Sequence, residues 1–332
     1  MKTIFIVDDN KYNLFSAKTA LEGVYKTYAL QSAERMFKVA ERIIPDLILL
    51  DIDMPEMDGF EAMQRLKADK RWNDIPVVFL TARNDEEAEI IGFDMGSLDF
   101  IHKPISPPVL IKRIETYLET DKLVKQSQKA LRNIHNATIS VIADLVETRD
   151  ETTGGHVART QIYIELLVNE LLRSGVYADE IAAWDLSLTL PSAQLHDVGK
   201  ISISDLILNK PGKLTDEEFE LIKHHCNKGE RMISRIIERT TNDMFLEHAK
   251  KFAAHHHEKW DGTGYPKGLR GEEIPLEGRI MAIADVYDAL VSKRPYKEPY
   301  SHAQAVDIIK KDSGTHFDPQ IVAAFLNVAE HF

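Results

Sequence analysis

The N-terminal part of the chain alternates short apolar runs with helix-like stretches, and this alternation limits the possible fold more than any other feature. The apolar runs are Lys2–Val7, Asp46–Leu50, Pro76–Leu80 and Asp99–His102. The helix-like stretches between them include Lys11–Glu22, Ala33–Ile43 and Glu86–Met95. Strands that alternate with helices at this spacing predict a doubly wound parallel α/β sheet.

Polar residues stand where these apolar runs end, and in such sheets the chemistry lies beyond the carboxyl ends of the strands. They are Asp8, Asp9, Asp51, Thr81 and Lys103. Three carboxylates at one edge repel each other unless a cation joins them, and oxygen ligands suit Mg²⁺. A lysine and a threonine hydroxyl can contact phosphoryl oxygens. Each residue alone fits a solvated loop equally well, so the prediction of a magnesium and phosphate site depends on the five together.

In this order the five residues resemble the response-regulator receiver domain, and the turns Met54-Pro55 and Asp58-Gly59 match that family as well. The resemblance implies a flavodoxin-like fold and phosphorylation of Asp51 by a sensor histidine kinase. The implied Mg²⁺ ligands are Asp8, Asp9, Asp51 and the backbone carbonyl of Asp53. The implied switch residues are Thr81, Phe100 and Lys103.

A long helix is predicted after this domain, because Pro107-Pro108 suits a helix start and neither Gly nor Pro follows until Gly154. One heptad position holds Val124, Leu131, Thr138 and Leu145, and a second holds Ser127, Ile134 and Val141. This apolar seam with polar interruptions predicts either a coiled coil in a homodimer or a single amphipathic helix packed on its own domain. A coiled coil would carry the state of the first domain to the second.

Helical periodicity dominates the rest of the chain, where we predict an all-α domain. The candidate helices are Val157–Leu172, Asp179–Leu190, Asp216–Cys226, Lys228–Glu238, Phe245–His256, Glu277–Ser292, His302–Asp312 and Asp318–His331. Thr215 before an acidic first turn predicts a capped helix start. We therefore divide the chain into a domain over 1–120, a connecting helix over 121–150 and a second domain over 135–332.

Histidines and aspartates dispersed through this region predict a metal site assembled by the fold. The pair His196-Asp197 combines an imidazole, which binds borderline cations, with a carboxylate that can bridge two of them. An isolated pair is ordinary, but it is accompanied here by His156, His225, His256, His257 and Asp285. Asp285 stands among apolar neighbours, where a carboxylate needs a partner or a metal.

The order His, His-Asp, Asp resembles the HD metal-dependent phosphohydrolases. With Gly264-Tyr265-Pro266 the region from about Ile134 onward is similar to the HD-GYP cyclic di-GMP phosphodiesterases. The resemblance implies two transition-metal ions, Fe or Mn before Ni, Co or Zn. The implied ligands are His156, His196, Asp197 and Asp285 for the first metal, and His225, His256 and His257 for the second, with Asp197 bridging. His255 would be a bystander, and Asp288 and Trp260 would hold the ligands and the loop in place.

The same resemblance implies that Asp197 and Lys200 are catalytic and that Lys200 contacts the scissile phosphate. The implied substrate-binding residues are Lys200, Tyr265, Arg294 and Lys297. Family members with three metals carry a Glu four residues before the position of His156, where this chain has Thr152 next to Glu151. One residue turns a helical side chain by about 100°, so we predict two metals rather than three.

Charge and composition limit the partners. A net charge of -12 over 332 residues argues against binding a nucleic acid polymer. The single cysteine, Cys226, fits a reducing cytoplasm, and no apolar run is long enough to cross a membrane. The start of the chain turns acidic at Asp8, too soon for a signal peptide. We predict a cytoplasmic protein that does not bind membranes.

The leading hypothesis is a two-component response regulator that hydrolyses cyclic di-GMP to pGpG under the control of Asp51 phosphorylation, with GMP as a further product left open. The alternative is a catalytically silent adaptor that binds cyclic di-GMP or a protein. The presence of Lys200, Tyr265, Arg294 and all the ligands counts against the adaptor. A hydrolase of another nucleotide is a third hypothesis, and the Gly264-Tyr265-Pro266 motif counts against it.

Overall fold

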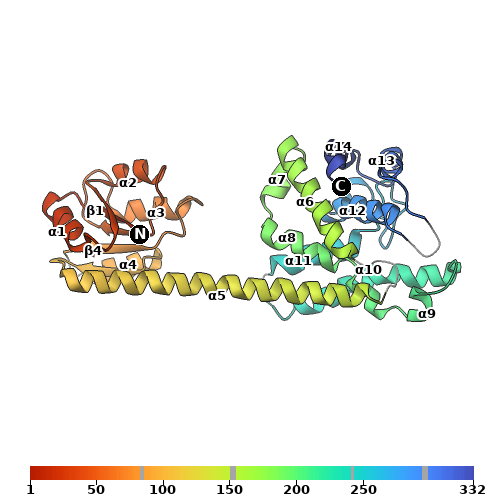
Figure 1. Cartoon of the computed structure of the whole chain (residues 1–332), viewed down its shortest axis with the longest axis horizontal. Coiled ribbons are helices and arrows are strands. Elements are labelled where there is room, and N and C mark those ends of the chain that lie inside the picture. The colour runs from red at the N-terminus through yellow and green to blue at the C-terminus, as the bar shows by residue number, and fades with distance from the viewer. Residues whose placement is uncertain (83–85, 150–154, 241–242, 294–297) are drawn as a thin grey trace. The chain divides into compact units, whose positions relative to one another are not determined.

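The computed structural model describes residues 1–82, 86–149, 155–240, 243–293 and 298–332. The chain divides into two compact units, Met1–Ala130 and Leu131–Phe332. The division falls within helix α5 (Pro107–Glu147), between the predicted end of the first domain at 120 and the predicted start of the second at 135. Figure 1 labels the elements of both units.

The N-terminal unit is a five-stranded parallel sheet in the order β2-β1-β3-β4-β5. Its strands are β1 (Thr3–Val7), β2 (Lys26–Leu30), β3 (Leu47–Asp51), β4 (Val77–Thr81) and β5 (Asp99–His102). Its helices are α1 (Lys11–Leu21), α2 (Ala33–Ala40), α3 (Gly59–Ala68), α4 (Glu86–Asp94) and the first part of α5. Two apolar clusters, one with α2 and α3 and one with α1 and α5, cover the sheet. The predicted doubly wound α/β fold is confirmed.

Two elements of this unit were not predicted. Strand β2 lies at the edge of the sheet, and of its residues only Leu30 is buried, so it lacks the continuous apolar run that marked β3 and β4. Helix α3 begins at Gly59, which the sequence analysis assigned to a turn. There Asp58 and Glu61 form a capping box that starts a helix instead.

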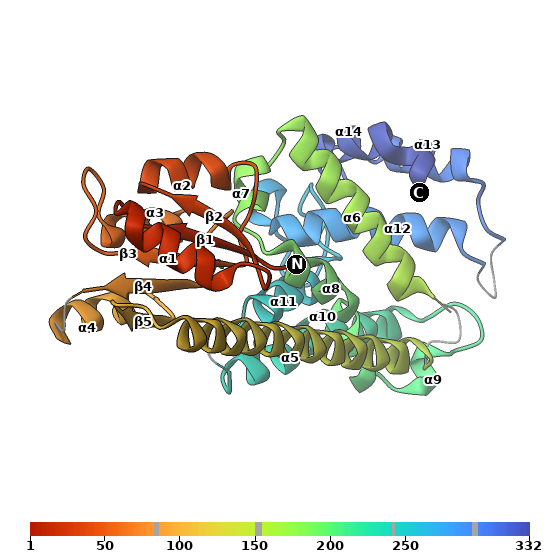
Figure 2. The ribbon, with the colours of Figure 1, turned by 60° about the vertical axis from the view of Figure 1, so that its left-hand side comes forward.

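The C-terminal unit is helical, as predicted. Its longer helices are α6 (His156–Ser174), α10 (Asp216–Ile237), α11 (Met244–His255), α12 (Leu276–Val291), α13 (His302–Lys311) and α14 (Pro319–Val328). The shorter ones are α7 (Ala178–Ala182), α8 (Leu186–Ser192), η1 (Ala193–Leu195), η2 (Val198–Ser202), α9 (Asp205–Leu208), η3 (Gly271–Glu273) and η4 (Ala329–His331). Figures 1 and 2 show α6, α12 and α14 grouped together, with α10 and α11 beside them. The main core lies among α6, α12 and α14.

Two predicted helices have different bounds in the structure. The stretch Asp179–Leu190 is broken, because the side chain of Asp185 accepts a hydrogen bond from the Ser187 N–H and starts a new helix, α8. The two stretches divided at Asn227 are a single helix, α10. Gly229 in α10 and Gly199 in η2 pack so closely that a Cβ on Gly199 would clash with the backbone of α10. Gly229 therefore lies inside α10 at its contact with η2 and does not end the helix.

Helix α5 is 41 residues long and carries the heptad seam on an exposed face. Leu131 is 69% exposed, Ile134 64% and Leu145 62%. The face that packs on the C-terminal unit is a different one, with Ala143 and Val146 buried. The seam is therefore not the surface by which α5 packs on its own domain. Neither α5 nor any other helix in the described ranges is long and apolar enough to cross a membrane.

Candidate metal centre and phosphoacceptor site

The predicted ligands of the first metal come together from three parts of the C-terminal unit. His156 is the first residue of α6, His196 lies between η1 and η2, and Asp285 lies on α12. Their ligand atoms all lie within 4.8 Å of one another. The Nε2 atom of His156 is 3.3 Å from Nε2 of His196 and 3.5 Å from Oδ1 of Asp285.

The predicted ligands of the second metal form another such group. His225 lies on α10, while His256 and His257 directly follow α11, and their ligand atoms are also within 4.8 Å of one another. The Nε2 atoms of His225 and His256 are 3.2 Å apart. His255, expected to be a bystander, is buried, belongs to neither group, and its Nδ1 has no hydrogen-bond partner.

The orientation of four imidazoles is fixed by their Nδ1 atoms. Nδ1 of His196 is 3.0 Å from the carbonyl oxygen of Ala193, that of His225 is 2.7 Å from the carbonyl of Ile222, and that of His256 is 3.0 Å from the carbonyl of Phe252. Nδ1 of His156 is 2.8 Å from Oδ2 of Asp288. Carbonyl and carboxylate oxygens only accept hydrogen bonds, so each Nδ1 carries the proton and each Nε2 presents a lone pair. Lone pairs that face each other in this way are the donor set of a metal site.

Asp197 reaches both groups with a different oxygen. Its Oδ2 is 3.3 Å from Nε2 of His196, and its Oδ1 is 3.3 Å from Nε2 of His225 and 3.7 Å from Nε2 of His256. Oδ1 is buried and has no hydrogen-bond partner, although buried carboxylate oxygens normally have one. Two cations would satisfy this oxygen and the four inward Nε2 atoms together. The residues therefore fit a pair of metals bridged by Asp197.

The surroundings of Asp197, His225 and His257 keep these three groups in the forms that bind metal. Burial opposes ionisation of Asp197, but Lys200 and His196 hold the pKa of its carboxyl well below the usual range. Burial lowers the pKa of His225 to about 4 and that of His257 well below its ordinary value. Metal ligands must be deprotonated, and an ionised aspartate with neutral imidazoles meets that condition.

His156 has a different environment, because its partner is a carboxylate rather than a carbonyl. Burial alone would lower its pKa, but the hydrogen bond to Asp288 and the charges of Asp285 and Asp197 raise it above the ordinary value. Asp288 is buried and also accepts hydrogen bonds from Nε and Nη2 of Arg159, at 2.6 and 3.0 Å. Asp288 thus holds His156, as expected, whereas Arg159 was not predicted.

The loop Gly264-Tyr265-Pro266 lies beside the second group of histidines. A Cβ on Gly264 would clash with the backbone of Lys259, so only glycine fits this close approach. The ring of Tyr265 lies 4.8 Å from that of His257. The ammonium of Lys223, two residues before His225 and not singled out from the sequence, lies 5.6 Å from the Tyr265 ring. The predicted residues Arg294 and Lys297, and the pair Glu151 and Thr152, lie outside the described residues.

Hydrogen bonds fix the backbone on both sides of this loop. Glu258 is buried, and its carboxylate accepts hydrogen bonds from the N–H groups of Lys267 and Leu269, at 2.8 and 3.1 Å. The N–H of Trp260 donates to the carbonyl of His316. We expected a structural role for Trp260 but did not predict one for Glu258.

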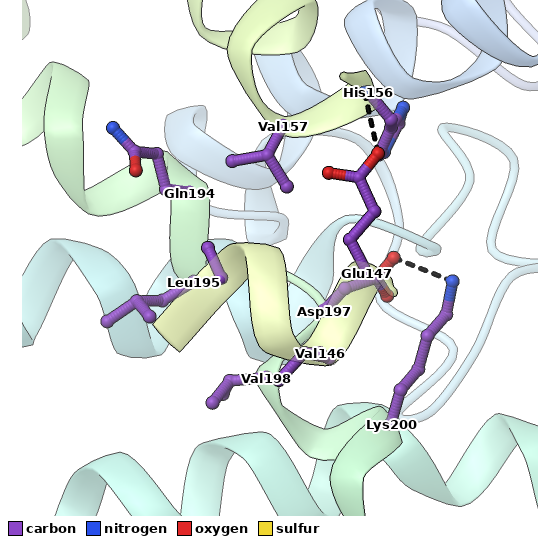
Figure 3. Close-up of a pocket in the computed structure, with 10 residues that line it drawn as sticks. Val146, Glu147, His156, Val157, Gln194, Leu195, Asp197, Val198 and Lys200 are labelled. Carbon is purple, nitrogen blue, oxygen red and sulfur yellow. Dashed lines mark hydrogen bonds and ion pairs between the residues drawn. The ribbon is translucent and has the colours of Figure 1, made fainter. Parts of the chain in front are cut away.

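A small cavity of about 20 Å³ adjoins the first group. Figure 3 shows Glu147 directed toward His156, and Lys200 directed toward Asp197. Nζ of Lys200 is 2.7 Å from Oδ2 of Asp197. Oε1 of Glu147 accepts a hydrogen bond of 2.7 Å from the backbone N–H of His156. Glu147 was not predicted to take part in the site.

In the N-terminal unit, Asp8, Asp9 and Asp51 form a third group with ligand atoms within 4.8 Å. Nζ of Lys103 lies 2.8 Å from Oδ2 of Asp8 and 2.6 Å from Oδ1 of Asp51. Burial, together with the charges of Asp8 and Asp9, raises the pKa of Asp51 to about 6 although Lys103 opposes the shift. The remaining predicted residues differ in exposure: Thr81 and Phe100 are buried, and Asp53 is exposed.

Comparison with protein families gives two matches. Residues 4–115 match the response regulator receiver domain, and residues 140–321 match the HD domain. The parallel sheet with its acidic edge and the helical unit with its His/Asp groups agree with these two matches. Together they define a response regulator with an HD domain.

Two curated relatives match over nearly the whole chain, and a third matches over part of it. A protein of Vibrio cholerae named "Probable cyclic di-GMP phosphodiesterase" is 39% identical over 99% of this chain and 78% of its own length. The "Cyclic di-GMP phosphodiesterase response regulator RpfG" of Xanthomonas campestris is 35% identical over 97% of this chain and 86% of its own length. A "3'3'-cGAMP-specific phosphodiesterase 2" of Vibrio cholerae is 39% identical over 61% of this chain and 36% of its own length. The chain belongs to the family of HD-domain response regulators, and the predicted resemblance and hydrolase class are confirmed.

Proposed function

We propose that this protein hydrolyses cyclic di-GMP to pGpG in its C-terminal unit and that phosphorylation of Asp51 controls the reaction. The observation that carries the proposal is the position of Asp197, which has one oxygen toward each group of histidines and Lys200 beside it. The full-length relatives named as cyclic di-GMP phosphodiesterases support the choice of substrate. Whether GMP is formed as a further product is left to the assay below.

Two transition metals, Fe or Mn before Ni, Co or Zn, would be held by the two groups and would supply positive charge that activates water and polarises the phosphodiester. The chain itself orients the site. Asp288 and the three carbonyls fix the imidazoles, and the ionised Asp197 offsets the positive charge. Lys200, whose Nζ is 2.7 Å from Oδ2 of Asp197, is proposed to donate to a phosphate oxygen of the substrate. Tyr265, Arg294 and Lys297 are proposed to bind the rest of the dinucleotide.

Control is proposed to begin at the acidic edge of the N-terminal unit. A sensor histidine kinase would supply the phosphoryl group to Asp51, with Mg²⁺ held by Asp8, Asp9, Asp51 and the carbonyl of Asp53. Lys103 and Thr81 are the residues proposed to contact the phosphoryl oxygens. Lys103 already bridges Asp8 and Asp51, so phosphorylation would change its partners.

The protein is further proposed to be a homodimer joined along α5. The heptad residues Leu131, Ile134, Val141 and Leu145 are all exposed. A second copy of the same helix covers such a seam because the 3.5-residue repeat is self-complementary in a coiled coil. Light scattering should show a dimer, and the double substitution Leu131→Glu, Ile134→Glu should shift it to monomer. A strict monomer for the unaltered protein at high micromolar concentration would contradict the dimer.

The activity is tested on protein purified without oxygen, with metals measured per chain and products separated by chromatography. Cyclic di-GMP should be cleaved with about two metals bound, in preference to 3'3'-cGAMP, which one relative is named for. The effect of acetyl phosphate and Mg²⁺ on the rate, with Asp51→Asn as the control, measures the regulation. A fully metallated protein that binds cyclic di-GMP without cleaving it would instead support the adaptor hypothesis.

A further inference from the structure

The C-terminal end of α5 contacts the helix that carries the first predicted ligand. Glu147, the last residue of α5, accepts a hydrogen bond from the N–H of His156, the first residue of α6. The first N–H groups of a helix have no partner within the helix. The residue before α6, Gly155, has no side chain to cap it. Glu147 therefore takes the place of a capping residue for the helix that positions His156.

The turn directly after α5, at Arg149, also holds the segment that carries Lys200. Arg149 donates from Nη1 to the carbonyl of Ile201 at 2.6 Å, and from Nη2 to the carbonyl of Ile203 at 3.1 Å. Its Nη2 also pairs with Asp205 at 2.7 Å. A guanidinium is suited to this role because its planar group presents several donors in a fixed geometry. Ile201 lies in η2 directly after Lys200, so Arg149 fixes the backbone beside the lysine.

Apolar contacts also hold α5 near its C-terminal end. Ala143 and Val146 are buried, and Ile139 packs with Leu195 and Val198 on either side of the His196-Asp197 pair. The adjoining cavity of about 20 Å³ has room for about one water molecule. A shift of the end of α5 therefore has to displace the residues that it touches.

We propose that Glu147 and Arg149 are positioning residues through which α5 sets the geometry of the metal centre. Glu147 acts on His156 through the start of α6, and Arg149 acts on Lys200 through the backbone of η2. This inference rests on the proposed function and deepens it, because it assigns the residues by which the position of α5 would change the activity. Neither side chain needs to touch metal or substrate in this role.

The test compares Glu147→Ala with Glu147→Gln, and Arg149→Ala with Arg132→Ala, in the full-length protein. The amide oxygen of glutamine can accept the same N–H, whereas alanine cannot. Arg132 is a matched control, since it lies on α5 and its hydrogen bond goes to Ser187 at 3.4 Å. Bound metal is measured by competition with a chelator. The values of kcat and KM are measured with cyclic di-GMP, and folding is checked by circular dichroism.

The expected result for Glu147→Ala is roughly tenfold weaker retention of one metal and a kcat lower by a similar factor, the effect of one lost hydrogen bond. Glu147→Gln should remain close to the unaltered protein in both. Arg149→Ala should keep both metals, lower kcat more than it raises KM, and reduce the response to acetyl phosphate. Arg132→Ala should change none of these.

Glutamine and alanine variants that lose metal equally would overturn the assignment of Glu147, because a charge or a direct ligand would then be required. An Arg149→Ala variant with an unaltered kcat and regulation would overturn that of Arg149. If Glu147→Ala does not fold, Glu147→Asp, whose shorter side chain falls short of the N–H, replaces it with the same expectation. Metal retention is measured without substrate, so it still tests the positioning of His156 by Glu147 if cyclic di-GMP proves not to be cleaved.

Discussion

Replacing Asp288 with asparagine should weaken the retention of one of the two proposed metals and leave that of the other unchanged. Asp288 accepts the proton of His156 Nδ1 at 2.8 Å and two donors of Arg159. An amide of the same shape cannot satisfy both partners. If its oxygen faces His156, its NH₂ group faces the donors of Arg159. If its NH₂ group faces His156, Nδ1 must become the acceptor and the proton moves to Nε2, the atom that faces His196.

The expected loss of metal affinity follows from the hydrogen bond by which Asp288 orients His156, a predicted ligand. Loss of a hydrogen-bond partner of a metal-ligating histidine typically costs about 10- to 100-fold in metal affinity or activity, or roughly 1.4–2.8 kcal/mol. Metal binding by the second group should not change, because backbone carbonyls that the substitution leaves in place hold Nδ1 of His225 and of His256. One metal should therefore become easier to remove by that factor.

The assay is titration of the metallated protein with a chelator, followed by metal analysis, with kcat measured in parallel. Asp307→Asn, an exposed position on α13, is the matched control and should behave like the unaltered protein. Asp288→Asn with unaltered retention of both metals would refute the tautomer argument. Equal loss of both metals would show that the substitution disturbs the fold rather than His156.

Further predictions concern Asp197 and Lys200 in the candidate metal centre, Asp51 in the N-terminal unit, and Glu277 on α12. Asp197→Ala should lose metal and activity together in the metal and turnover assays, whereas Lys200→Ala should keep both metals and lose roughly 10- to 150-fold in turnover, since it removes a charge-assisted contact to phosphate. Asp51→Asn should abolish labelling by acetyl phosphate, and stoichiometric labelling of that variant would contradict the assignment. Burial would raise the pKa of Glu277, but hydrogen bonds from His248 and Lys251 hold it below the ordinary 4.5. The ionised Glu277 therefore stabilises the folded state. This contribution is complete above pH 4.5 and is lost as the pH falls through the lower pKa of the folded state. Glu277→Gln should therefore lower the melting temperature at pH 7 by an amount corresponding to about 1.5–3 kcal/mol, and a difference that persists undiminished at pH 3 would contradict this.

Both fold classes could be predicted from the amino-acid sequence alone. Local backbone geometry sets the spacing of buried side chains, and it depends on neighbouring residues. The sequence therefore shows it directly, as apolar runs at β3 and β4 and as helical periodicity after residue 135. The edge strand β2 escaped prediction because few of its side chains are buried. The sequence also contained the three carbonyl partners of His196, His225 and His256, which lie three or four residues earlier and follow from helical turns.

The distant residues that support the predicted ligands could be identified only from the folded structure. Asp288 lies 132 residues from His156, and Arg149 contacts carbonyls more than fifty residues away. No periodicity connects such pairs, because they meet only when α12 packs on α6 and when the turn after α5 contacts η2 and the residue that follows it. Packing likewise decided which face of α5 is buried, at Ala143 and Val146, and which remains exposed. Residue type identifies the candidate ligands, whereas the packing around them sets the orientation of their side chains.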